Sequence, residues 1–331
     1  MLEQIRKIYG LVLQTTTLTT RVGLPPMADD EPMSLLGRLM PIVIRLRGSK
    51  RRYRTRENVR HHTRELTVRP RPVSPPKRLS KGVSITATTK LGWRIYRIEP
   101  STAPSRGTVI YLHGGGFIHE AGRAHWHWVQ RLAVEARITV LMPVYPLAHE
   151  GGTAAEVVPT VADLCEQLDG PVVLMGDSAG GTIAASASLL LKERASPALT
   201  VLISACFDLS LTNPQIDRID PEDPWLAKPG LVEVAETWWI GDDFDDPVLN
   251  PINGDPAGLC PLMIFSGTRD ILNPDTRVFV ERAIAAGVQV HYIERPGHLH
   301  VFPLLPIREG RQARRQVIDA VRGAVEGTPV E

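Results

Sequence analysis

The residues with the clearest chemical potential stand together in one hexapeptide, Gly176-Asp177-Ser178-Ala179-Gly180-Gly181. Residues 172–175 before it are apolar and indicate a buried strand, and the small residues of 182–191 after it indicate a buried helix. A Gly-x-Ser-x-Gly pattern between a strand and a helix is typical of a nucleophile elbow, a strained turn that exposes its serine. The pattern therefore predicts that Ser178 is a nucleophile at the first turn of a helix.

A serine hydroxyl is a weak nucleophile, so it needs a base, and the base needs a carboxylate to orient it. With such an elbow the chain order is serine, then acid, then histidine. Asp270 lies just past the apolar run 261–266, where the orienting acid is expected. His298 and His300 both lie in the loop after the next predicted strand, 289–293. Spacing alone leaves either histidine as the base.

Three consecutive glycines follow His113, directly after the apolar run 108–112. Acyl transfer places negative charge on the former carbonyl oxygen, and each pre-aimed N–H donor is worth roughly 10²–10³ in rate. Glycines let the backbone approach a ligand closely, although such a run is also compatible with a plain flexible loop. With the elbow downstream, we expect this loop and the N–H of Ala179 to form an oxyanion hole.

Strand-like and helix-like stretches alternate around these residues. The predicted strands are 83–89, 93–98, 108–112, 139–144, 172–175, 199–205, 261–266 and 289–293, of which the first two form an antiparallel pair. The predicted helices are 125–136, 154–168, 182–191, 274–286 and 309–325. This alternation favours an α/β fold, with an eight-stranded, mostly parallel sheet covered by helices on both faces.

Two regions interrupt or precede this alternation. Residues 208–256 are rich in Asp and Pro and hold one helix-like segment, 231–240, which indicates a cap over the strand ends. Residues 34–44 suggest an amphipathic helix broken at Pro41. The basic run 45–64 that follows favours a solvated or cap-associated face over an anionic partner. We therefore predict an N-terminal extension and cap segment over 1–80, and a catalytic domain over 81–331.

Composition is ordinary for a soluble globular protein: 43% of the 331 residues are hydrophobic, 22% are charged, and the net charge is +2. Nucleic acid is therefore not an expected partner. The three cysteines have no metal or redox spacing, so we expect free thiols in a reducing compartment. Residues 1–26 make a poor secretory signal, and no apolar run is long enough to span a membrane. A cytoplasmic location is expected, with peripheral membrane or envelope association left open.

The chain resembles the hormone-sensitive-lipase-like branch of the α/β-hydrolases, and in particular its bacterial esterases, over about residues 82–325. Four motifs carry the resemblance: His113-Gly114-Gly115-Gly116-Phe117, the hexapeptide around Ser178, Gly267-Thr268-Arg269-Asp270-Ile271-Leu272, and His300-Val301-Phe302. One motif departs, because Tyr145-Pro146-Leu147-Ala148-His149-Glu150 carries His149 where the family usually has proline. The loop around His149 is therefore expected to be reshaped.

The resemblance implies specific roles. The family's catalytic histidine stands two residues before a phenylalanine, which selects His300 over His298. Its oxyanion donors correspond to Gly115, Gly116 and Ala179. The resemblance also implies a serine carboxylesterase for short- to medium-chain esters with a Ser178-Asp270-His300 triad. It implies that no metal or cofactor is needed. It further implies a helical cap, and pairing of two copies through 289–293 and 309–325.

Other activities remain compatible with the same residues. A lipase, an amidase or peptidase, or an acyltransferase would use the same triad, because a fold does not determine the substrate. A protein with this fold that only binds a small ligand would typically lack a triad member, and here every member is present. The sequence therefore favours ester hydrolysis.

Overall fold

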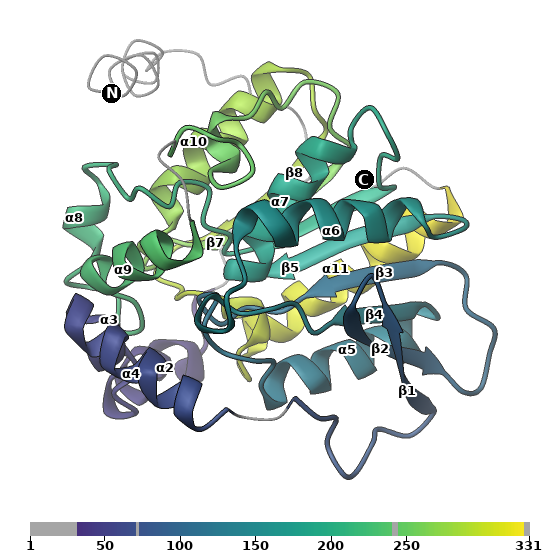
Figure 1. The fold of residues 1–331 in the computed structure, drawn as a ribbon, viewed down its shortest axis with the longest axis horizontal. Helices are drawn as coiled ribbons and strands as arrows, with labels where there is room; N and C mark the ends of the chain where they lie inside the picture. Colours follow the sequence, from purple (N-terminus) through teal and green to yellow (C-terminus); the bar gives the residue numbers. More distant parts are fainter. Residues whose placement is uncertain (1–31, 71–72, 240–243, 328–331) are drawn as a thin grey trace. The chain divides into compact units, whose positions relative to one another are not determined.

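The computed structural model describes residues 32–70, 73–239 and 244–327, and a central sheet organises them (Figure 1). Its strands are β1 (Val83–Lys90), β2 (Trp93–Pro100), β3 (Thr108–Leu112), β4 (Thr139–Pro143), β5 (Val172–Asp177), β6 (Leu199–Ile203), β7 (Leu262–Gly267) and β8 (Val290–Arg295). They lie in the order β1-β2-β4-β3-β5-β6-β7-β8. β2 is antiparallel to both neighbours, and every other pair is parallel. The predicted eight-stranded, mostly parallel sheet is confirmed.

Helices follow the strands along the chain. Those of the sheet-forming region are α5 (Arg123–Ala136), α6 (Ala154–Glu166), α7 (Ala179–Leu191), α10 (Asn273–Ala285) and α11 (Arg308–Glu326). The N-terminal region contributes α2 (Leu35–Leu46), α3 (Ser49–Tyr53) and α4 (Arg56–Val68), and the segment after β6 contributes α8 (Ile216–Ile219) and α9 (Lys228–Trp238). Short 3₁₀ turns lie at Ala148–Glu150, Pro251–Asn253 and Phe302–Leu304.

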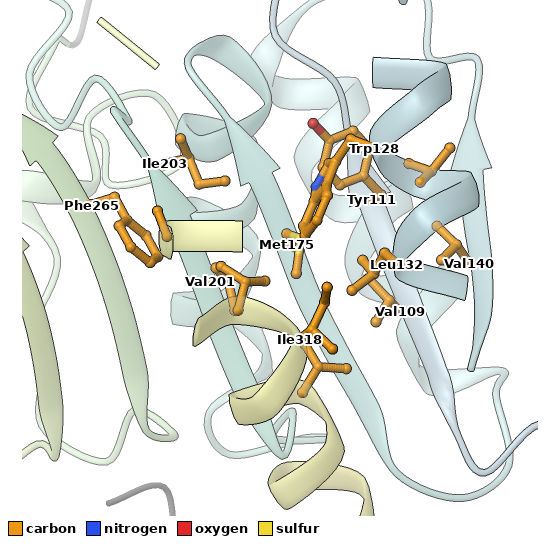
Figure 2. Close-up of a cluster of buried hydrophobic side chains, with 14 of the residues drawn as sticks. Val109, Tyr111, Trp128, Leu132, Val140, Met175, Val201, Ile203, Phe265 and Ile318 are labelled. Carbon is orange, nitrogen blue, oxygen red and sulfur yellow. The ribbon is translucent and has the colours of Figure 1, made fainter. Parts of the chain in front are cut away.

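The central strands β3 to β7 are buried on both faces of the sheet, since nearly all of their residues are buried and alternate side chains point to opposite faces. Val109 and Tyr111 of β3 and Met175 of β5 join one cluster with Leu132 of α5 and Ile318 of α11 (Figure 2). The residues between them in β3 and β5 are equally buried. This double burial explains why the strands appear in the sequence as continuous apolar runs instead of alternating ones.

Helix α7 is buried almost all round, because its small residues allow close packing in the centre of the molecule. The hydroxyl groups of Ser188 on α7 and Thr200 on β6 lie 2.7 Å apart, so this buried polar pair is satisfied. The N-terminus of α7 starts directly after Ser178. Tight packing of α7 therefore holds the serine in a defined place.

The basic N-terminal helices pack against the insertion that follows β6. Arg60 of α4 donates two hydrogen bonds to the carboxylate of Glu233 on α9, at 2.7 and 2.9 Å. Nearby, Arg56 donates to Glu236 at 2.6 Å. At Gly230 a Cβ atom would lie 2.4 Å from the backbone of Tyr53, so only glycine allows α9 to lie so close to α3. Part of the basic run thus faces acidic residues of the insertion.

Some expectations need correction. α2 continues through Pro41 and is not broken there, since the proline removes one hydrogen bond, to Gly37, while Met40 and Ile44 anchor the helix in the core. α9 starts earlier than predicted and ends at Trp238, because Trp239 adopts an extended backbone. Residues 1–26 lie outside the described part. Residues 33–330 form one compact unit, and the division at residue 80 stays a prediction.

Candidate active site

Ser178, Asp270 and His300 follow three different parallel strands and meet at the carboxyl edge of the sheet. The Oγ atom of Ser178 lies 2.9 Å from Nε2 of His300. On the other side of the imidazole, Nδ1 lies 2.8 Å from Oδ2 of Asp270. Both are hydrogen-bond distances. The arrangement allows a proton to pass from the serine hydroxyl to a histidine whose far side faces a buried carboxylate.

The backbone at Ser178 is held in a strained conformation. Its φ is +51°, a region that non-glycine residues seldom occupy, and its N–H donates to the carbonyl of Ile203 at 2.8 Å. Two positions away on each side, close packing requires glycine. A Cβ at Gly176 would lie 2.2 Å from the Gly180 carbonyl oxygen, and a Cβ at Gly180 would lie 2.0 Å from that of Leu112. The glycines therefore permit the turn that exposes the hydroxyl.

The second histidine of the loop lies elsewhere. The ring of His298 packs beside Phe302, with ring centroids 5.1 Å apart. Its carbonyl oxygen accepts the N–H of Arg269 at 3.0 Å, which fixes the acid loop. The ring of His300 is hydrogen-bonded to Ser178 and Asp270. Among the described residues, no such bond joins the ring of His298 to either of them.

The charge environment of His300 favours a protonated imidazole. Burial alone lowers its pKa, but the nearby carboxylates, Asp270 first and then Asp223 and Asp177, outweigh burial and raise the pKa above its ordinary value. A buried imidazolium between carboxylates is the charge distribution that forms when a histidine takes a proton from a serine. The site is thus pre-arranged for a base that becomes positively charged.

Three backbone N–H groups next to Ser178 have no partner within the described part of the chain: those of Gly115, Gly116 and Ala179. All three residues line the same cavity as Ser178 and His300. Ala179 is buried and the two glycines are partly buried. Backbone donors away from bulk solvent are usually paired, so open donors around one cavity indicate a place for an oxygen of a ligand.

Asp177 anchors the glycine loop. Its Oδ1 accepts the N–H of Gly114 at 3.0 Å and the hydroxyl of Tyr111 at 2.5 Å, and its Oδ2 lies 3.3 Å from Nε2 of His125. Burial alone would raise the pKa of this carboxyl, but these neighbours outweigh burial and hold it below the usual range. The sequence suggested only a small polar turn residue at this position. Its position directly before Ser178 is the sequence signal that could have indicated this role.

The cavity in front of Ser178 has a volume of about 220 Å³ and a largely apolar lining. Trp225, Leu226 and Leu231 line it from the insertion, and Tyr53 lines it from α3. Burial raises the pKa of Tyr53 to about 12, so its hydroxyl stays protonated. The ring of Trp225 stands edge-on to that of His300, with centroids 5.9 Å apart. The insertion and the N-terminal helices therefore both shape the space that a ligand would occupy.

Asp223 connects this lining to the acid loop, and nothing in the sequence pattern singled it out. It is buried; its Oδ1 accepts the N–H groups of Trp225 and Leu226 at 2.7 and 3.0 Å, and its Oδ2 accepts that of Ile271 at 3.1 Å. Burial and the Asp270 carboxylate raise the pKa of Asp223 to about 6. One side chain thus positions both the cavity wall and the residue after Asp270.

Comparison with known proteins identifies the family of this fold. The family model described as the α/β hydrolase fold matches residues 109–304, more than half of the chain. The chain belongs to the α/β-hydrolase fold family. A solved esterase of the bacterial hormone-sensitive lipase family aligns with a TM-score of 0.73 and 27% identity, covering 89% of this chain and all of that one. The branch of the family that the motifs suggested is therefore confirmed.

Two curated proteins are also similar to this α/β-hydrolase in sequence. An acetyl-hydrolase of Streptomyces hygroscopicus is 32% identical over 65% of this chain and 75% of its own length. A triacylglycerol lipase of Mycobacterium tuberculosis is 30% identical over 70% of this chain. The match spans only 50% of that lipase.

The three cysteines, Cys165, Cys206 and Cys260, are free and buried in the structure. Among the described residues, no helix combines the length and the apolar character that crossing a bilayer requires.

Proposed function

We propose that this protein is a carboxylic ester hydrolase that acts through an acyl-enzyme on Ser178. In this mechanism Ser178 Oγ attacks the ester carbonyl while Nε2 of His300 takes its proton. Asp270 holds the imidazole tautomer and stabilises its charge. The N–H groups of Gly115, Gly116 and Ala179 receive the oxyanion, and His300 then protonates the leaving alcohol. Water, activated by the same histidine, releases the acid from the acyl-enzyme.

The observation that carries this proposal is the continuous hydrogen-bonded path Ser178–His300–Asp270, at 2.9 and 2.8 Å, beside three open N–H donors. Each part alone has another explanation, such as a buried polar network or a flexible loop. Their meeting at one apolar cavity matches the requirements of acyl transfer. The names of the relatives, acetyl-hydrolase and triacylglycerol lipase, support esters as the substrate class.

The size of the cavity favours short acyl chains. Its volume of about 220 Å³ lies below the roughly 300–1,000 Å³ of sites for drug-sized ligands. We therefore expect kcat/KM for p-nitrophenyl esters to be highest for acetate to butyrate, and to fall at least about tenfold by octanoate as each added methylene loses its fit. Initial rates across the series, from acetate to palmitate, test this. A maximum at palmitate would contradict short-chain preference and favour a lipase.

Replacing Asp223 with asparagine should shift the pH profile of hydrolysis. His300 must be neutral to act as the base, and the negative charge of Asp223 is one of the groups that raise its pKa. Without that charge the pKa of His300 falls, so the acid limb of the kcat/KM profile moves to lower pH. The rate at the optimum also falls, since an amide NH₂ group cannot accept the N–H of Ile271.

Asp220→Asn provides a matched control. Asp220 lies close in sequence and pairs with Lys50 at 3.3 Å, but it is not among the groups that raise the pKa of His300. The acid limb of the kcat/KM profile of Asp220→Asn should coincide with that of the wild type. An Asp223→Asn profile with a lower rate but an unmoved acid limb would reduce Asp223 to a purely structural role.

A further inference from the structure

Helix α2 has apolar side chains on two opposite sides. On one side Met40 and Ile44 are buried in the main core cluster. On the other side a row of side chains is open to solvent: Leu35 is 74% exposed, Leu39 44%, Ile42 53% and Leu46 82%. We call these four residues the α2 stripe. Leu36 of the same helix is exposed as well, so α2 carries most of the exposed large apolar side chains in the described residues.

The spacing of the α2 stripe makes it a continuous surface. Residues at i, i+4, i+7 and i+11 lie on one side of an α-helix, and a helix of this length extends over about 18 Å. A surface helix normally turns charged and polar residues outward. An outward apolar row on a helix whose other side is already packed indicates an interaction surface.

The charges around the α2 stripe specify the kind of partner. Residues 35–54 contain no acidic residue, and their basic residues are Arg38, Arg45, Arg47, Lys50, Arg51, Arg52 and Arg54. Lys50 pairs with Asp220. Within the described part of the chain, the arginines at 47, 51, 52 and 54 make no ion pair, and all four are exposed. The surface is therefore apolar in the middle and strongly positive beside it.

A second copy of this chain fits that surface poorly. A two-fold interface would place the same basic run near itself, and like charges facing each other oppose association. An anionic lipid surface supplies both missing partners, because its acyl region accepts leucine and isoleucine and its headgroups accept arginine. We propose that α2 and the basic run after it bind the protein reversibly to an anionic membrane surface.

This placement has a consequence for the cavity. α3 follows α2 after a short turn, and its last residue, Tyr53, lines the space in front of Ser178. A membrane bound at α2 would thus lie beside α3, the helix that contributes Tyr53 to the cavity lining. Binding itself requires no catalysis, so the proposal stands or falls separately from ester hydrolysis.

Sedimentation of the full-length protein with phosphatidylcholine vesicles, with and without phosphatidylglycerol, tests the proposal. We expect at least about tenfold stronger binding to the anionic vesicles, weakening as salt is raised. The double variant Leu39→Glu/Ile42→Glu should lose at least about tenfold in binding, because charged side chains do not enter the acyl region. The variant Arg51→Gln/Arg52→Gln should lose about fivefold per charge removed on anionic vesicles only.

Ile284→Glu is the matched control, because Ile284 is an exposed apolar residue on α10, at 46%, outside this surface. It should bind vesicles like the wild type, and all variants should hydrolyse soluble p-nitrophenyl acetate equally. Absence of wild-type binding to anionic vesicles would overturn the proposal, as would undiminished binding by Leu39→Glu/Ile42→Glu. A wild-type dimer that becomes monomeric in this double variant, without vesicle binding in either protein, would instead assign the α2 stripe to a second copy.

Discussion

Replacing Ser178 with alanine should lower kcat for p-nitrophenyl butyrate by at least about a thousandfold, because it removes the hydroxyl on which the proposed acyl-enzyme forms. The effect should appear in kcat and not in KM, since alanine leaves the cavity and the open N–H donors of Gly115 and Gly116 in place. Steady-state kinetics with purified protein measure both quantities. A small residual rate is expected, because oriented donors still stabilise attack by water.

Ser186→Ala is the matched control for this substitution. Ser186 is another buried serine of the same region, on α7, and its hydroxyl has no hydrogen-bond partner among the described residues. Its loss should leave kcat within about twofold, as for a substitution that removes no interaction. Equal rates for Ser178→Ala and the wild type would show that Ser178 is not the nucleophile.

Alanine at His300 and alanine at His298 should have very different effects. His300→Ala removes the base that lies 2.9 Å from Ser178, so kcat should fall by at least about a thousandfold. His298→Ala removes a ring that packs beside Phe302, so it should lower stability more than rate and keep kcat within about tenfold. Kinetics and thermal unfolding of both variants separate the two roles. A reversed order of effects would assign the base to His298.

The strands and central helices could be predicted from the sequence because their signals are local. β3, β5 and β7 are continuous apolar runs, and α7 follows its glycine-flanked serine directly. The effect of Pro41 is an exception, because the packing of Met40 and Ile44 keeps α2 helical across the proline. A propensity argument cannot include such tertiary contacts before the partner surface is known.

Side chains that act between distant segments were harder to foresee. Asp223 stands 48 positions before Ile271, whose N–H it accepts, and no spacing rule connects the two. Tyr53 reaches the cavity from a segment whose basic composition indicated only a solvated or cap-associated face. The choice between His298 and His300 likewise depended on the resemblance, because both lie in one loop. These roles could not be predicted because the interacting residues lie far apart in the sequence, although their side chains are chemically well suited to them.

The central claim, an acyl-enzyme on Ser178, is tested most directly by mass spectrometry of protein quenched in acid during rapid turnover of p-nitrophenyl butyrate. We expect the peptide containing Ser178 to gain the mass of one butyryl group, fragmentation to place that group on Ser178, and Ser178→Ala to show no gain. A butyryl group on another residue, or full turnover with no acylated peptide, would contradict the account.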